Sequence, residues 1–159
     1  MAYPGNAYPG EPYPGNSGYP GNPGNTGYPA SAYANWGQRV GAYLIDGIPN
    51  LVLAVIGAAF ISHSIVIYLL CLLISLGWTI YNRWIQMGNT GQSLGKRTLG
   101  IRLVKETTGE PIGAGMAFVR DICHIVDAII CYIGFLFPLW DAKRQTLADK
   151  IVGTVVVPA

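Results

Sequence analysis

The chain has 159 residues, enough for one small domain, and 51% of them are apolar while only 11% are charged. That charged share is about half of what soluble domains carry, which indicates lipid as the main solvent. The net charge of +2 is too small to predict a nucleic-acid partner. The three cysteines lie in apolar segments without a CxxC pair, so we expect neither a disulfide scaffold nor a metal site.

The first 35 residues repeat the unit Tyr-Pro-Gly-Asn, and Glu11 is their only charge. Pro-Gly favours isolated turns, and no aliphatic face is present to offset the entropy of ordering. We therefore expect a disordered tail at 1–35, followed by a membrane domain at 36–159. The tyrosines leave two interpretations open, a solvated spacer or an adhesive segment that stacks on partners. No basic region followed by an apolar one opens the chain, so we expect no cleavable signal peptide.

Two apolar stretches approach the length of about 20 residues that crosses a bilayer. We expect helices over 39–61 and 65–81, with an aromatic belt at the end of the second. The link at 62–64 is so short that the helices must form an antiparallel hairpin. Because this link lacks Lys and Arg, which are frequent after the second helix, the positive-inside rule places the later segment and the N-terminal tail in the cytoplasm.

A polar stripe runs along the first helix, with one residue per turn on the same face: Arg39, Tyr43, Asp46 and Asn50. We expect it to face a similar stripe on the second helix: Tyr68, Ser75, Thr79 and Asn82. Pro49 predicts a kink beside Asp46. A bare carboxylate in hydrocarbon costs about 2.5–3.5 kcal/mol on insertion scales, so Asp46 must be paired, protonated or hydrated. Two roles stay open, a buried ion pair that fixes helix register and an ion or proton site.

The segment 86–116 is basic and rich in glycine but lacks the spacing of a phosphate-binding loop. We expect its basic side chains to face anionic lipid headgroups: Lys96, Arg97, Arg102 and Lys105. Apolar and charged residues alternate at 101–105 and are followed by a glycine-containing turn, which predicts a short hairpin or extended pair. The β-branched run 154–157 is a second candidate to pair with 101–105.

The last apolar region covers 117–140, and Arg120, His124 and Asp127 share one of its faces. That face is a candidate to meet Asp46 and Arg39. A single crossing would place the basic residues after 140 outside, against the positive-inside rule, so we favour a broken or re-entrant segment. The fold class expected is an all-α membrane protein, with a transmembrane hairpin, this third segment and small extended cytoplasmic elements.

Several motifs occur together: Arg39 opening a helix, Asp46 inside it, the block 91–96 (GQSLGK), and 145–149 (QTLAD) followed by Gly153-Thr154. In combination they resemble the RDD family of bacterial membrane proteins, which is named for one arginine and two aspartates. The motif match assigns these to Arg39, Asp46 and Asp149. The tail and the stretches 106–112 and 127–144 resemble the proline-rich antigen type of RDD protein.

The resemblance implies a multi-pass protein of the bacterial plasma membrane with no established activity. Transport has been suggested for the family, and cation/proton exchange for some members. Because the sequence shows no catalytic constellation, metal cluster or phosphate motif, we expect no enzymatic activity and no cofactor. We favour a structural or interaction component whose partners are the lipid bilayer and a second copy or another membrane protein. The alternative is a small oligomeric transporter that moves protons or monovalent cations past Asp46, with His124 and Asp127 lining the path.

Overall fold

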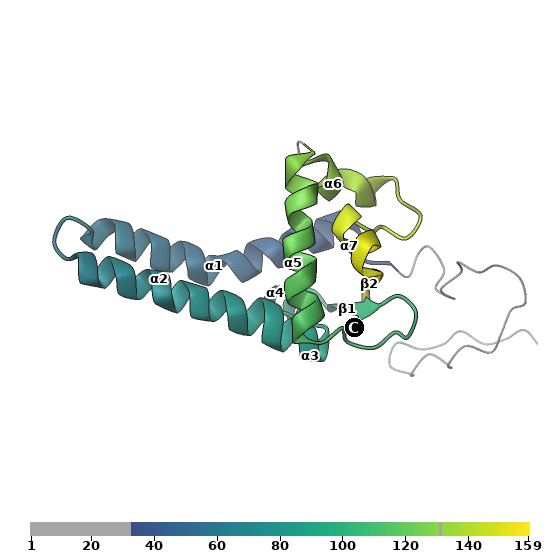
Figure 1. Cartoon of the computed structure of the whole chain (residues 1–159), viewed down its shortest axis with the longest axis horizontal. Helices are drawn as coiled ribbons and strands as arrows, with labels where there is room; N and C mark the ends of the chain where they lie inside the picture. The colour runs from purple at the N-terminus through teal and green to yellow at the C-terminus, as the bar shows by residue number, and fades with distance from the viewer. Residues whose placement is uncertain (1–32, 131) are drawn as a thin grey trace, which may run out of the picture.

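The computed structural model describes residues 33–130 and 132–159, and a long helical hairpin extends from one side of it (Figure 1). Helix α1 (Trp36–Phe60) runs outward to a short turn, and α2 (Ile65–Thr79) runs back against it. The second helix continues to Thr90, and both helices are long and apolar enough to cross a membrane. The predicted hairpin is therefore confirmed. The predicted tail lies outside the described residues, apart from its last three positions.

Helix α1 begins at Trp36, earlier than the apolar run suggests, because a capping box precedes it. The Asn35 side chain accepts a hydrogen bond from the backbone N–H of Gln38 (2.8 Å), and the Gln38 side chain accepts one from the backbone N–H of Asn35 (2.9 Å). These bonds satisfy N–H groups that the first helical turn leaves without partners. Pro49 lies inside α1, which remains helical on both sides of it, and the kink stays a prediction.

The second helix also extends past its expected end, through the π-helical segment η2 (Ile80–Gln86) into α3 (Met87–Thr90). Two side chains of η2 bond to different parts of the protein. Asn82 donates a hydrogen bond to Asp46 in α1, whereas Trp84 donates one to Asp121, which lies beyond the hairpin. The end predicted from hydropathy comes too early, because the last turns of this helix carry polar side chains that contact the rest of the protein.

A two-stranded antiparallel sheet lies at the base of the hairpin. Strand β1 (Ile101–Lys105) pairs with β2 (Thr154–Pro158), and Leu103 stands opposite Val156. The pairing suggested by the β-branched run is therefore present. The chain after β1 does not return as a neighbouring strand, and the distant β2 takes that place.

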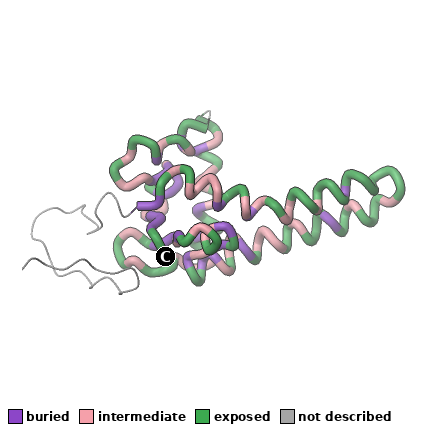
Figure 2. The backbone as a smooth tube through the Cα atoms, turned by 180° about the vertical axis from the view of Figure 1, so that it is seen from behind, coloured by how far each residue is buried: buried purple, intermediate pink, exposed green. Residues whose placement is uncertain are grey.

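The buried core also lies at this base, whereas most of the hairpin surface is exposed (Figure 2). Met87 packs with Ile101, Leu103 and Val156 in one cluster. Tyr33 packs with the valines of the strands in a second cluster. The folded part therefore includes Tyr33, which precedes the boundary drawn from composition.

Helix α5 (Ala114–Ile129) lies across the base of the hairpin rather than along it (Figure 1). The short helix α6 (Ile133–Leu136) and the 3-10 segment η3 (Phe137–Leu139) follow, bent by 107° from α5. This geometry confirms the broken third helical segment. Much of the exposed surface of α5 is apolar: Met116, Phe118, Val119, Ile122, Ile125, Val126 and Ile129. An apolar face on a helix set across a spanning hairpin is typical of helices that lie in a membrane interface.

Candidate functional site

Two short helices bring polar residues together at the hairpin base. Helix α4 (Leu94–Thr98) starts after Ser93, and α7 (Leu147–Val152) starts after Thr146. In both, the hydroxyl before the helix accepts a hydrogen bond from a backbone N–H of the first turn. Each N-terminus also receives a carboxylate from a longer helix, which is favourable because its N–H groups carry partial positive charge.

Asp46 of α1 binds the N-terminus of α4. Its Oδ1 accepts hydrogen bonds from the backbone N–H of Gly95 and from Asn82 Nδ2, both at 2.8 Å. Its Oδ2 accepts one from the Ser93 hydroxyl at 2.6 Å. The residue is only 9% exposed. Three donors around a buried carboxylate satisfy it without a bonded cation.

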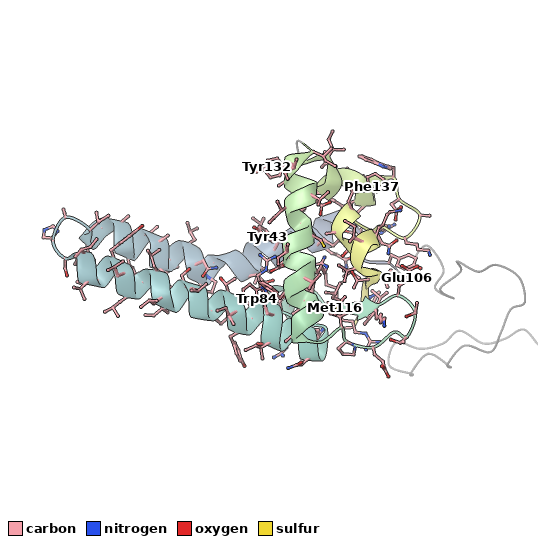
Figure 3. The ribbon with its side chains drawn as sticks, viewed as in Figure 1. Tyr43, Trp84, Glu106, Met116, Tyr132 and Phe137 are labelled. Atoms are coloured by element: carbon pink, nitrogen blue, oxygen red, sulfur yellow. The ribbon has the colours of Figure 1, made fainter. Side chains whose placement is uncertain are left out.

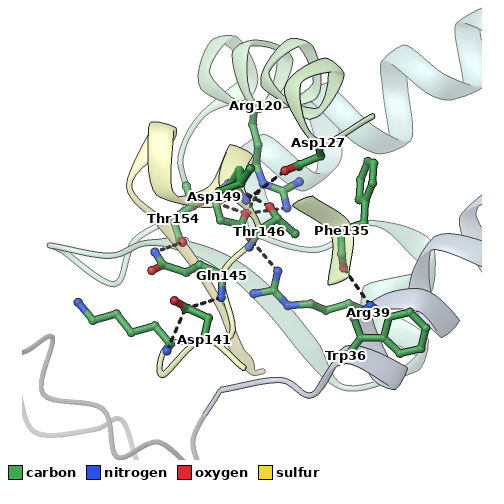
Figure 4. A network of polar contacts seen from close by, with 12 residues as sticks. Trp36, Arg39, Arg120, Asp127, Phe135, Asp141, Gln145, Thr146, Asp149 and Thr154 are labelled. Atoms are coloured by element: carbon green, nitrogen blue, oxygen red, sulfur yellow. Dashed lines mark hydrogen bonds and ion pairs between the residues drawn. The ribbon is translucent and has the colours of Figure 1, made fainter. Parts of the chain in front are cut away.

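Asp149 is fully buried and bonds to two arginines (Figure 4). Arg39 Nη1 donates to Oδ2, and Arg120 Nε and Nη2 donate to Oδ1 at 2.8 and 2.7 Å. The Thr154 hydroxyl also donates to Oδ1, at 3.1 Å. Burial alone would raise the pKa of the Asp149 carboxyl, but attraction by Arg120 and Arg39 outweighs it and holds the pKa well below its ordinary value. One carboxylate thus joins α1, α5, α7 and β2.

Asp127 of α5 binds the N-terminus of α7. Its Oδ1 accepts a hydrogen bond from the backbone N–H of Leu147 (3.1 Å), and its Oδ2 lies 2.6 Å from His124 Nδ1. A Cβ atom at Gly134 would overlap the Asp127 side chain, so α6 packs directly against this carboxylate. The pair formed by His124 and Asp127 therefore fixes α6 and α7 to α5.

Further ion pairs surround the base. Asp121 accepts hydrogen bonds from Arg83 Nη2 (2.9 Å) and Trp84 Nε1 (3.0 Å), which join α5 to η2. Two more ion pairs join segments of the base: Glu106 with Lys143, and Asp141 with Lys150. The carboxylates of the base thus mainly join one segment to another.

A cavity of about 600 Å³ lies between α1, η2, α5 and α6. Four basic side chains line it: Arg39, Arg83, Lys96 and Arg120. Arg39 Nε and Nη2 are buried and have no hydrogen-bond partner among the described residues. Burial and repulsion by Arg120 lower the pKa of the half-buried Lys96 to about 7, against the opposing attraction of Asp46. The cavity therefore holds donors that the fold itself does not satisfy.

The structure brings the predicted charged residues together in separate groups. Arg39 and Arg120 meet on Asp149, whereas Asp46 bonds to neutral donors and His124 bonds to Asp127. The predicted interhelical stripe is present in part: Asn50 bonds to Ser75 (2.7 Å) and Thr79 (3.2 Å), and Asp46 to Asn82, whereas Arg39 bonds to Asp149 instead.

Sequence reasoning did not single out Ser93 as a ligand of Asp46. Its signal is the helix-capping position before the short basic helix α4. Among the residues predicted to face headgroups, Arg97 and Lys105 are exposed, and Arg102 is partly buried. Lys96 instead lines the cavity. Contact of these side chains with headgroups stays a prediction.

Metal ligands were not predicted, and within 33–130 and 132–159 no group of three or more His, Cys, Asp and Glu side chains is placed to hold a metal ion.

An apolar hairpin, a broken third helix and a compact polar base define an α-helical membrane protein. A family model described as the RDD family matches residues 33–153, and the chain belongs to this family. The family resemblance drawn from Arg39, Asp46 and Asp149 is therefore confirmed.

Named relatives are mycobacterial. The chain is 42% identical over 153 residues to the "Proline-rich antigen homolog" of Mycobacterium tuberculosis (strain ATCC 25618 / H37Rv), with 80% of this chain and 64% of that protein covered. It is 39% identical over 153 residues to the "Proline-rich antigen" of Mycobacterium leprae (strain TN), with 80% and 61% covered. The chain thus spans less than two thirds of the length of these relatives. No solved structure matches the chain.

Proposed function

We propose that this RDD-family chain is a non-enzymatic structural or interaction component of the bacterial plasma membrane. The hairpin anchors the protein, and the base presents a folded surface to partners on the cytoplasmic face. The observation that carries this proposal is the use of Asp46, Asp127 and Asp149 as contacts between segments. Carboxylates that hold segments of the fold together are what we expect of a structural protein.

The environment of Asp46 argues against the alternative, a transporter that exchanges cations and protons. An acid that carries ions must exchange its ligands during each cycle. Asp46 accepts hydrogen bonds from Asn82, Ser93 and the backbone of Gly95, so releasing it would free the N-terminus of α4. The arrangement therefore favours a fixed carboxylate.

Charge and exposure support the assignment of surfaces. The hairpin turn at 61–64 lacks Lys and Arg, whereas the base is rich in them, which favours a cytoplasmic base by the positive-inside rule. The exposed apolar side chains of α1 and α2 suit lipid, a second copy or another membrane protein.

The two functions differ in what Asp46→Asn should do. We expect the 159-residue wild-type chain in vesicles to show no cation-dependent proton flux, and the variant to lose thermal stability in detergent. Glu110→Gln, which changes an exposed acid, is the matched control and should leave stability unchanged. Wild-type flux that Asp46→Asn abolishes while the protein stays assembled would establish transport and refute the scaffold.

A further inference from the structure

The cavity between α1 and α5 has features that a purely structural base does not explain. Arg39 donates a hydrogen bond to Asp149 through Nη1 only. Its buried Nε and Nη2 have no hydrogen-bond partner among the described residues. The Lys96 ammonium group also lines the cavity, and its hydrogen-bond acceptor is the Met87 thioether at 3.3 Å. A thioether is a weak acceptor, so both Arg39 and Lys96 retain N–H donors for an anion.

The carboxylates near the cavity do not fill that need. Asp46 and Asp121 also line it, but they accept hydrogen bonds from α4 and from η2. Asp149 is shared by Arg39 and Arg120, so two guanidinium groups face one carboxylate. The donors left over are therefore available to a ligand with its own negative charge.

The rim of the cavity is apolar and exposed. Tyr43 and Tyr132 line it, are 63% and 67% exposed, and lie on the side of α5 toward the hairpin (Figure 3). Ile125, also on the rim, is 56% exposed. Counting back about 20 residues from Phe60, the length that crosses hydrocarbon, reaches the turn of α1 between Arg39 and Tyr43. The cavity therefore lies at the level of the headgroups, with basic walls and an apolar entrance.

We propose that this cavity binds the phosphate headgroup of an anionic phospholipid, with Arg39 and Lys96 as donors. The rim then contacts the glycerol and upper acyl region, which a free anion lacks. A bound phosphate gives Arg39 Nε and Nη2 the acceptors that the protein does not supply, and charge-assisted bonds to phosphate are among the stronger contacts available. This site goes beyond the proposed function and does not rest on it.

Adjacent basic residues offer a matched test. Lys96→Gln removes a cation from the cavity, whereas Arg97→Gln removes one from the exposed surface of the same helix. The full chain in neutral detergent is titrated with short-chain phosphatidylglycerol, short-chain phosphatidylcholine and inorganic phosphate. We expect Lys96→Gln to weaken phosphatidylglycerol binding about tenfold and Arg97→Gln to change it less than about twofold.

The other outcomes overturn the proposal. Equal losses in both variants would mean diffuse attraction to a basic surface. Equal affinity for the two lipids would remove the need for an anionic headgroup. Inorganic phosphate that binds as tightly as phosphatidylglycerol, and depends on Lys96, would assign the site to a free anion.

A second pair of variants tests the entrance of the cavity and leaves its basic residues unchanged. This pair decides the question in case the Lys96→Gln variant does not fold. Ile125→Glu places a negative charge at the rim, whereas Ile122→Glu places one on the exposed surface of α5 outside the cavity. We expect only the change at 125 to weaken phosphatidylglycerol binding, by about tenfold. No loss at 125, or the same loss at 122, would refute the site.

Discussion

The carboxylate of Asp46 accepts a hydrogen bond of 2.8 Å from the backbone N–H of Gly95, which joins the spanning helix α1 to the first turn of α4. This bond requires the two backbones to approach closely. A Cβ atom at Gly95 would overlap the backbone carbonyl of Ala42, one turn before Asp46 in α1. Gly95 therefore permits the contact that satisfies the buried acid.

Gly95→Ala should consequently destabilise the protein by about 1–3 kcal/mol, because the added methyl group pushes α4 away from Asp46. Unfolding in mixed micelles, followed by circular dichroism, measures the change. Gly115→Ala is the control, since a Cβ atom there meets nothing within 4 Å. Alanine also favours helix over glycine, so the control should be neutral or slightly stabilising. Equal stability of both variants would show that α4 can move without cost.

Asp149→Asn should be more damaging, at about 3–5 kcal/mol, because it leaves two buried arginines without their countercharge. The side chains of Arg39 and Arg120 are 11% and 7% exposed, so water cannot replace the carboxylate fully. The same unfolding assay measures the loss, with the exposed Glu110→Gln as control. A loss below about 1 kcal/mol, the range of surface ion pairs, would contradict the central role given to Asp149.

The Asp149 network also shows where sequence reasoning reaches its limit. Hydropathy and the short link at 62–64 were enough for the hairpin, because lipid imposes length and composition on each helix separately. Spacing along a helix predicted the stripe that pairs Asn50 with Ser75. The bond between Arg39 and Asp149 joins residues 110 positions apart, and a contact of that kind leaves no periodic trace.

Capping residues set the starts of α1 and α7, and a hydropathy pattern does not detect them. Asn35 and Gln38 form a capping box that starts α1 earlier than the apolar run does. Thr146 and Asp149 form another, which starts α7. The second box also turns Asp149 inward beside α5. Asp149, one of the residues assigned to the family motif, therefore both caps the start of α7 and pairs with two arginines.

Lys96 predicts an alkaline dependence of stability. Its folded-state pKa is about 7 against an ordinary 10.5, so between these values the unfolded chain binds more protons than the folded chain. Stability should therefore rise with pH across that window in lipid-free neutral detergent. Lys96→Met should remove the rise, whereas Lys105→Met, at an exposed position, should keep it. Unfolding measured at several pH values checks this, and an unchanged rise in Lys96→Met would contradict it.

The sheet predicts the topology of the third helical segment. Strand β1 precedes 114–139 and β2 follows it, and the two strands pair, so both ends of the segment should lie on one side of the membrane. Single cysteines at Gly109 and Ala159, in a chain whose native cysteines are replaced by alanine, should react with an impermeant maleimide only after the cytoplasmic side is opened. A cysteine at His63, in the hairpin turn, should react in intact cells. Labelling of Ala159→Cys from outside would mean that the segment crosses once, and that the sheet does not form in the membrane-inserted protein.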